Sequence, residues 1–486
     1  MVNMLFKKQP IIEDVTGMNE QIYRKKVLGC WLGKAVGGTL GAPIEGWDGP
    51  HHLDFYDPVP TTMVPNDDLD LQVVWAMTIA AQPKPVVNSR VLAEAWLKNV
   101  GFPWDEYAVA IRNLKNGIMP PFSGSYDNWF VDGMGCAIRS ELWACLAPGN
   151  PERAAKLSYE DACVDHDGDG MWAEVFLAAM ESAAFIENDV RKIIEIGKEQ
   201  IPTGLKLREG IEDAIRWYDE KPEFGYLFDK IMTKYKSDNF TDVKVNFPIM
   251  VAALLLGKGD FSKSICDAVN FGEDTDCTGA TVGALLGIMN PDSIPEKWLA
   301  PIGRDMVLSP GIVGITPPPT IDAFSDMICE MSKHIILDPQ PATSFEPRPI
   351  HACAIVRPAR SKAEPEQEVS FPGTFCEWPE VLPDKHELVL DFKFKISKAG
   401  KYVVMFNSKS QVIVDIDGNL AFRRSPGDMA PSFHRAPWNQ EVFMDFEPGI
   451  HTIRAIVQRV APNTRPNWVV GVAYADSLQW VPDAML

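Results

Sequence analysis

The chain has 486 residues, with 46 Lys or Arg and 66 Asp or Glu, so its formal net charge at pH 7 is −20. Apolar residues make up 46% and charged residues 23%, which is the composition of a folded globular protein. At roughly 100–200 residues per domain, this length predicts about two to four domains. The acidic balance argues against a nucleic-acid partner, because binding to phosphate backbones needs clustered Lys and Arg side chains.

No feature of the sequence suggests a membrane protein. The N-terminal segment lacks the apolar stretch and the small-residue cleavage site of a signal peptide. The longest apolar runs, 249–257 and 278–289, are shorter than the ~18 residues that a membrane helix needs. Nine cysteines without a CxxC pair indicate reduced, buried thiols. We therefore expect a cytoplasmic protein with no membrane partner.

The first 337 residues have the pattern of an all-α domain. Apolar residues recur at spacings of three and four, and short breaks rich in Pro, Gly and Asp separate these stretches. The predicted helices span 20–40, 69–81, 91–99, 172–186, 190–200, 207–218, 245–256 and 278–289.

The first predicted helix carries Gly29, Gly33, Gly37 and Gly41 at a spacing of four. Each glycine inside a helix costs up to about 1 kcal/mol relative to alanine, so the stripe needs a structural reason. We expect another backbone to approach this face closely. The helix is followed at once by Glu45, which taken alone fits a solvated loop residue better than a functional one.

Two acidic clusters stand directly before or at the start of apolar helices. The first contains Asn66, Asp67 and Asp68, and the second contains Asp274 and Asp276. Helix capping accounts for one or two such residues at each start. If both starts converge, at least four carboxylates crowd together and need a counter-charge. Oxygen ligands of this kind suit Mg²⁺, Mn²⁺ or Ca²⁺, so a metal site and simple capping both remain open.

A third acidic loop, 165–170, matches the first half of an EF-hand calcium loop. The twelfth position of that loop needs a bidentate glutamate, and here it is Phe176, which argues against an EF-hand. His166 in this loop is either a substrate contact or a histidine hydrogen-bonded to a helix start.

The pattern changes after residue 337. Prolines concentrate in the following segment, and 338–365 is predicted to be an extended connection. Beyond it, alternating apolar residues predict strands at 388–394, 402–406, 412–416, 442–446, 452–457 and 468–474. We therefore expect a second, all-β domain over 366–486, a β-sandwich or jelly roll.

Four segments of the first domain, taken in order, resemble the ADP-ribosylglycohydrolase family. The glycine-rich helix ends in the family's G-x-x-x-G-x-P-x-E pattern at 37–45, and its T-D-D-T block corresponds to 66–69. Its histidine loop is similar to 165–172, and its G-D-T-D-T helix start is similar to 272–277. Each block is weak alone, but all four occur in register over about residues 20–310.

The resemblance implies an all-α domain that holds two Mg²⁺ ions, with Mn²⁺ as an alternative. The positions that match metal ligands are Asn66, Asp67, Asp68, Asp274 and Asp276. Asn66 and Cys277 replace family threonines. An asparagine still offers a carbonyl oxygen, whereas a thiol is a poor ligand for Mg²⁺. The number of metals and the substrate are therefore left open by the sequence.

The chemistry that the resemblance implies is cleavage of a glycosidic bond at a ribose anomeric carbon, in an ADP-ribosyl or related ribosyl compound. Metals would orient the ribose hydroxyls and activate water. Glu45, Asp68 or Asp276 would handle the proton. His166 and Asp169 are the expected substrate contacts.

Two other functions fit the same sequence. One is a metal-dependent glycosidase acting on a different carbohydrate, with the β domain binding sugar. The other is a catalytically inactive ligand-binding protein, in which Cys277 marks a lost metal. Tyr126, Trp129 and Phe130 are expected either to stack on an adenine or to pack their own loop. The aromatic residues that could bind sugar, or else fill the β-domain core, are Trp378, Trp438 and Trp468.

Overall fold

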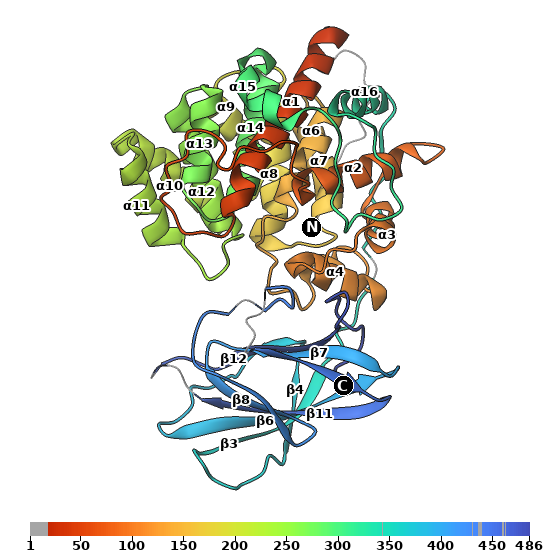
Figure 1. Cartoon of the computed structure of the whole chain (residues 1–486), viewed down its shortest axis with the longest axis vertical. Helices are drawn as coiled ribbons and strands as arrows, with labels where there is room; N and C mark the ends of the chain where they lie inside the picture. The colour runs from red at the N-terminus through yellow and green to blue at the C-terminus, as the bar shows by residue number, and fades with distance from the viewer. Residues whose placement is uncertain (1–17, 343, 430, 436–439, 459–460, 462) are drawn as a thin grey trace.

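The computed structural model describes residues 18–342, 344–429, 431–435, 440–458, 461 and 463–486. A helical domain lies at one end of the long axis and a β domain at the other (Figure 1). The predicted order, helices first and antiparallel strands second, is confirmed. No helix in the described ranges is both long and apolar enough to cross a membrane.

Each of the predicted helices corresponds to an observed one, and further helices lie between them. Several that the apolar spacing missed bury polar side chains, such as Glu106 on α4 and Glu160 on α7, which weakens the pattern. The helices are α1 (Glu20–Gly41), α2 (Asp67–Ala80), α3 (Ser89–Asn99), α4 (Asp105–Lys115), α5 (Phe122–Ser125), α6 (Ser140–Leu146), α7 (Pro151–Ala162), α8 (Gly168–Ala184), α9 (Val190–Glu199), α10 (Lys206–Glu220), α11 (Phe224–Tyr235), α12 (Val243–Gly257), α13 (Phe261–Asn270), α14 (Thr275–Met289), α15 (Glu296–Ile302) and α16 (Ile321–Met331).

Helices α1 and α14 pack closely along the glycine stripe, as expected. A Cβ atom on Gly33 would lie 2.1 Å from the carbonyl oxygen of Gly283, and one on Gly41 would lie 2.2 Å from that of Thr275. Only glycine permits this approach. Because the end of α1 meets the start of α14, the chain that follows α1 runs past the acidic start of α14.

The β domain contains two antiparallel sheets around one apolar core. Their strand orders are β10-β7-β12-β5 and β4-β3-β6-β11-β8-β9. A short parallel pair, β1 (Val86–Val87) with β2 (Ile336–Leu337), belongs to the helical half. The other strands are β3 (Ile350–Pro358), β4 (Gln367–Phe371), β5 (Phe375–Glu377), β6 (His386–Ile396), β7 (Gly400–Asn407), β8 (Gln411–Ile416), β9 (Asn419–Arg424), β10 (Glu441–Phe446), β11 (Gly449–Gln458) and β12 (Asn467–Tyr474).

The predicted connection at 338–365 contains a strand. β3 pairs with β6 from Ala352 to Pro358, so the sheet begins before residue 366. The prolines around it suggested an extended linker, but Pro358 stands at the end of the strand, where a missing N–H is tolerated.

The candidate sugar-binding tryptophans do not form an exposed group. Trp468 is fully buried in the core between the sheets and stacks on Phe406, so it is not a surface platform. Trp378 is half-buried against the same core. Trp438 lies outside the described residues. Of the two alternatives for Trp468, the structure confirms packing in the core, because its strand is buried on both faces.

Helix α4 is one element of the helical domain that contacts the β domain. Its Ala108 belongs to a buried cluster with residues of β7, β12 and the segment before β10. The Arg112 guanidinium lies 4.8 Å from the ring centroid of Trp480 and donates a hydrogen bond to Thr374. The two domains therefore share an apolar interface along α4 (Figure 1).

Candidate metal centre

The two acidic helix starts converge in the structure. Asp68 at the start of α2 and Asp276 and Cys277 at the start of α14 each offer a ligand atom, and these atoms lie within 4.8 Å of one another. Glu45, Asp274 and Asp276 form a second such group. Asp276 belongs to both groups and joins them into one acidic centre.

The oxygens of this centre fit a hard divalent cation. Asp68 Oδ2, Asp276 Oδ1 and both carboxylate oxygens of Asp274 are buried and accept no hydrogen bond from the described residues. A buried charged oxygen without a partner is costly, and crowded carboxylates repel one another. Burial raises the pKa of Asp274 well above the usual range, and the charges of Asp276 and Glu45 raise it further. Burial also raises the pKa of Asp276 well above the usual range, together with the charges of Glu45 and Asp68. A cation ligated by these oxygens would remove both costs.

Lys34 supplies the counter-charge on the inner side of the centre. Its Nζ lies 3.1 Å from Asp68 Oδ1 and 2.8 Å from Glu141 Oε1, and all three side chains are buried. Burial alone would lower the pKa of Lys34, but Glu141 and Asp68 raise it. Lys34 was not predicted from the sequence as part of the site. The sequence feature that could have indicated its role is a single lysine among the apolar and small residues in the second half of α1.

Asn66 links the two helix starts. Its side-chain oxygen accepts a hydrogen bond from the backbone N–H of Asp68 at 2.8 Å, which caps α2. Its amide nitrogen donates to Asp276 Oδ2 at 3.1 Å. The oxygen that was expected to bind metal thus caps the helix, and the metal-binding role of Asn66 stays a prediction.

Cys277 lies among the carboxylates as a thiol. Burial raises its pKa well above the usual range, and Asp274 and Asp68 raise it further. Since the thiolate is the form that binds metals, the protonated group is a poor ligand here.

Asp67 is hydrogen-bonded to a residue of α4. The hydroxyl of Tyr107, in the first turn of α4, donates to Asp67 Oδ2 at 2.9 Å and to the carbonyl of Gly135 at 3.1 Å. Burial raises the pKa of Asp67, and Asp68 and Asp276 raise it further. Tyr107 was missed from the sequence because nothing in its own segment marks it as a partner of Asp67.

Glu45 is the exposed member of the centre. The surrounding protein and the charge of Asp67 raise the pKa of its carboxyl to about 7, while Arg435 opposes this shift. Arg435 comes from the β domain, and burial lowers its own pKa to about 10. Glu45 therefore changes protonation near neutral pH beside a cation from the other domain.

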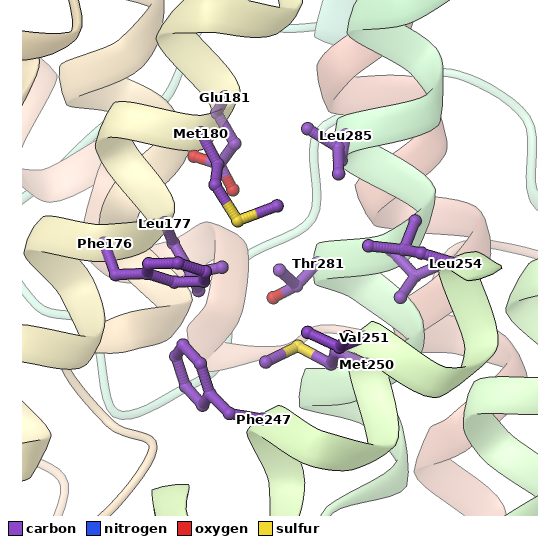
Figure 2. Close-up of a pocket in the computed structure, with 11 residues that line it drawn as sticks. Phe176, Leu177, Met180, Glu181, Phe247, Met250, Val251, Leu254, Thr281 and Leu285 are labelled. Atoms are coloured by element: carbon purple, nitrogen blue, oxygen red, sulfur yellow. The ribbon is translucent and has the colours of Figure 1, made fainter. Parts of the chain in front are cut away.

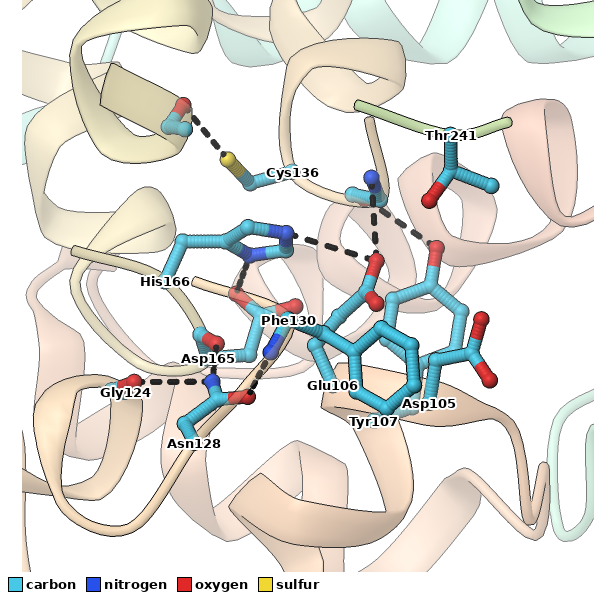
Figure 3. A network of polar contacts seen from close by, with 12 residues as sticks. Asp105, Glu106, Tyr107, Gly124, Asn128, Phe130, Cys136, Asp165, His166 and Thr241 are labelled. Atoms are coloured by element: carbon cyan, nitrogen blue, oxygen red, sulfur yellow. Dashed lines mark hydrogen bonds and ion pairs between the residues drawn. The ribbon is translucent and has the colours of Figure 1, made fainter. Parts of the chain in front are cut away.

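His166 is buried rather than exposed to the acidic centre. Its Nδ1 lies 3.1 Å from Asp165 Oδ1 and its Nε2 lies 3.3 Å from Glu106 Oε1 (Figure 3). Burial lowers the pKa of His166, but Cys136 and Asp165 outweigh it and raise the pKa. Asp169 is half-buried and accepts a hydrogen bond from the backbone N–H of Leu207. Substrate contact by His166 and Asp169 stays a prediction.

The three aromatic residues of the 126–130 segment face the domain interface. The hydroxyl of Tyr126 donates to the carbonyls of Arg348 and Pro372. Trp129 packs on the interface cluster, and the buried ring of Phe130 lies under the Arg435 guanidinium at 5.7 Å. Of the two expectations for this segment, the contacts favour packing.

An apolar cavity lies elsewhere in the helical domain, between α8, α12 and α14 (Figure 2). Side chains such as Phe176, Phe247 and Leu285 surround it, and Glu181 is its one charged residue. It lacks the convergent polar groups of a binding site for a charged or sugar ligand. The acidic centre is therefore the stronger candidate site.

The sequence of the helical domain matches a known protein family. The model of the ADP-ribosylglycohydrolase family matches residues 19–317. A solved ADP-ribosylglycohydrolase-related protein complex is 18% identical, with 64% of this chain and 98% of that chain covered and a TM-score of 0.45. A β-glucosidase from Kluyveromyces marxianus is 11% identical over 26% of this chain and 15% of that chain, with a TM-score of 0.20. No curated protein matches the sequence. Because the family model spans more than half of the chain, this chain belongs to the ADP-ribosylglycohydrolase family.

Proposed function

We propose that this protein is a metal-dependent hydrolase that cleaves the glycosidic bond of ADP-ribosyl or related ribosyl compounds. Family membership supports a glycohydrolase activity. The observation that carries the proposal is the acidic centre, where Glu45, Asp68, Asp274 and Asp276 converge from three segments and leave buried oxygens without hydrogen bonds.

The residues that would hold Mg²⁺ or Mn²⁺ are Asp67, Asp68, Asp274 and Asp276. When bound, such an ion stabilises developing negative charge and makes a water molecule more acidic. Lys34 neutralises the inner oxygen of Asp68 and leaves Oδ2 of that carboxylate free. The hydroxyl of Tyr107 donates a hydrogen bond to Asp67 Oδ2 and so orients that carboxylate.

Glu45 is the residue that we assign to proton transfer. It is exposed at the edge of the centre, and its pKa of about 7 lets it both accept and release a proton at neutral pH. Asp276 and Asp68 would mainly provide negative charge, which stabilises the positive charge that develops on the ribose ring during glycosidic cleavage.

The test is calorimetric titration with Mg²⁺ and then with ADP-ribose, on the wild type, Asp274→Asn and the exposed control Asp292→Asn. We expect ADP-ribose to bind only after Mg²⁺, and Asp274→Asn alone to lose both. Metal binding without ADP-ribose binding would favour a different carbohydrate. Absence of both would favour a ligand-binding protein without metal chemistry.

A second measurement tests catalysis. Release of ADP-ribose from an ADP-ribosylated protein is expected to fall by about 10²–10⁴-fold in Glu45→Gln, as for the loss of a general acid or base. Mg²⁺ affinity should change much less in the same variant. A rate equal to that of the wild type would remove Glu45 from the mechanism.

A further inference from the structure

One charged side chain of the β domain, Arg435, lies at the edge of the acidic centre. Arg435 lies between β9 and β10, and two described residues before it are buried. Met429 and Phe433 are buried in the interface cluster, and the ring of Phe433 lies 4.8 Å from that of Trp480. The position of Arg435 therefore depends on how the β domain packs on α4.

Arg435 binds the first residue of α4. Its Nε donates to Asp105 Oδ1 at 3.2 Å, its second terminal nitrogen pairs with Asp105 Oδ2, and that nitrogen lies 3.4 Å from Asn239 Oδ1. Such a two-point contact between guanidinium and carboxylate fixes orientation as well as distance. Asp105 has a φ of 33°, a conformation that a residue with a side chain adopts when its surroundings hold it there.

The next two residues of the same turn, Glu106 and Tyr107, contact buried groups of the helical domain (Figure 3). The carboxylate of Glu106 accepts from the backbone N–H of Gly135 at 3.1 Å and lies beside His166. The hydroxyl of Tyr107 donates to Asp67. Three consecutive residues thus connect the β domain, the buried histidine and the acidic centre.

Arg435 also lies beside the exposed edge of the centre. Its guanidinium is 4.6 Å from the centroid of the Phe240 ring. That ring faces the backbone next to Glu45, since a Cβ atom on Gly46 would lie 3.3 Å from its Cε1. Arg435 is therefore linked to the centre in two ways, by its pair with Asp105 on α4 and by its contact with Phe240 beside Glu45.

We infer that Arg435 is a positioning residue of the metal centre, through which the β domain holds the first turn of α4 so that Tyr107 orients Asp67. The inference rests on the proposed metal site. The β domain then contributes to that site, and the helical domain alone does not hold all of its residues in place.

The test uses the full chain and measures Mg²⁺ affinity by calorimetry. Tyr107→Phe is expected to weaken Mg²⁺ binding about tenfold, as is typical when an outer partner of a ligand is removed. Arg435→Gln should weaken it in the same direction, and the double variant should lose no more than the larger single loss. Arg435→Lys should restore part of the affinity, because a lysine keeps the charge but not the two-point contact.

Lys409→Gln is the matched control. Lys409 is also a β-domain cation, and it pairs with Asp238, a residue of the helical domain outside α4. This variant should keep the wild-type Mg²⁺ affinity. If Arg435→Gln folds poorly, Asp105→Asn breaks the same pair from the other side.

Amide hydrogen exchange provides a readout that does not need the metal. In Arg435→Gln, exchange should rise in the first turn of α4, and in Lys409→Gln it should not. Wild-type Mg²⁺ affinity in both Arg435→Gln and Asp105→Asn, or additive losses with Tyr107→Phe, would overturn the inference. A wild-type protein that binds no Mg²⁺ would instead contradict the proposed function itself.

Discussion

Gly37 and Gly279 face each other where α1 crosses α14, and a Cβ atom on Gly37 would lie 1.9 Å from the carbonyl oxygen of Gly279. This contact sets the distance between the two helices. Glu45 follows the end of α1, and Asp274 and Asp276 stand at the adjacent start of α14. The metal centre therefore depends on a backbone contact that lies outside it.

Gly37→Ala should destabilise the protein and weaken Mg²⁺ binding. The added methyl group has no space, and overpacking of this kind costs about 1–3 kcal/mol or more. Urea unfolding measures the loss. Gly225→Ala is the control, because Gly225 is exposed in α11 and an added Cβ meets no atom within 4 Å. It should be neutral or stabilising by up to about 1 kcal/mol. Equal effects of the two changes would contradict the packing argument.

Replacing Lys34 should be costly for a different reason. Lys34→Met leaves the buried carboxylates of Asp68 and Glu141 without their cation, and breaking a buried pair costs about 3–5 kcal/mol. Lys25→Met, on the exposed side of the same helix, should change the unfolding free energy by less than about 1 kcal/mol. Chemical denaturation of both variants compares them directly. Similar small losses would show that Lys34 is not the counter-charge.

Mg²⁺ should stabilise the folded protein. At a concentration about 100-fold above the dissociation constant, a ligand that binds only the native state contributes about 2.7 kcal/mol. We expect a higher unfolding temperature in Mg²⁺ than in KCl of equal ionic strength, measured by calorimetric scanning. Asp276→Asn should abolish this difference, because Asp276 is common to both groups of ligand atoms. A shift that survives in the variant would place the bound metal elsewhere.

The affinity for Mg²⁺ should rise with pH. Burial and neighbouring carboxylates raise the pKa of the proposed ligands Asp274 and Asp276. At acid pH, protons therefore compete with the metal. Titrations in buffers of different ionisation enthalpy should detect proton release on binding. An affinity independent of pH between about 5 and 8 would contradict this assignment.

The same shifts predict how the metal-free protein responds to pH. Its folded state holds protons that the unfolded chain has lost, so the unfolding free energy should fall as pH rises from about 4 to 7. With Mg²⁺ bound, that fall should become smaller. Urea unfolding at several pH values, with and without Mg²⁺, measures the difference.

The sequence predicted the parts of this protein that depend on local pattern. Periodicity located helices such as α1 and α14 and strands such as β6, because each buries one face or alternates between two. It missed β3, whose prolines suggested a linker, and α4, whose buried polar residues hide the apolar stripe. It left open whether Trp468 binds sugar at the surface or fills the core, and only the structure shows that it is buried, since exposure is not a local property.

The sequence by itself determined the two-domain order, the close-packing glycine stripe, the carboxylates at two helix starts and the resemblance to a glycohydrolase family. These features are set by residue type and spacing along the chain. Only the tertiary structure decided the partners of those carboxylates: Lys34 beside Asp68, Tyr107 on Asp67, and Arg435 on Asp105, a pair 330 residues apart in the sequence. Such pairs follow from how helices and domains pack, because charges that are distant along the chain interact only once folding has buried them together.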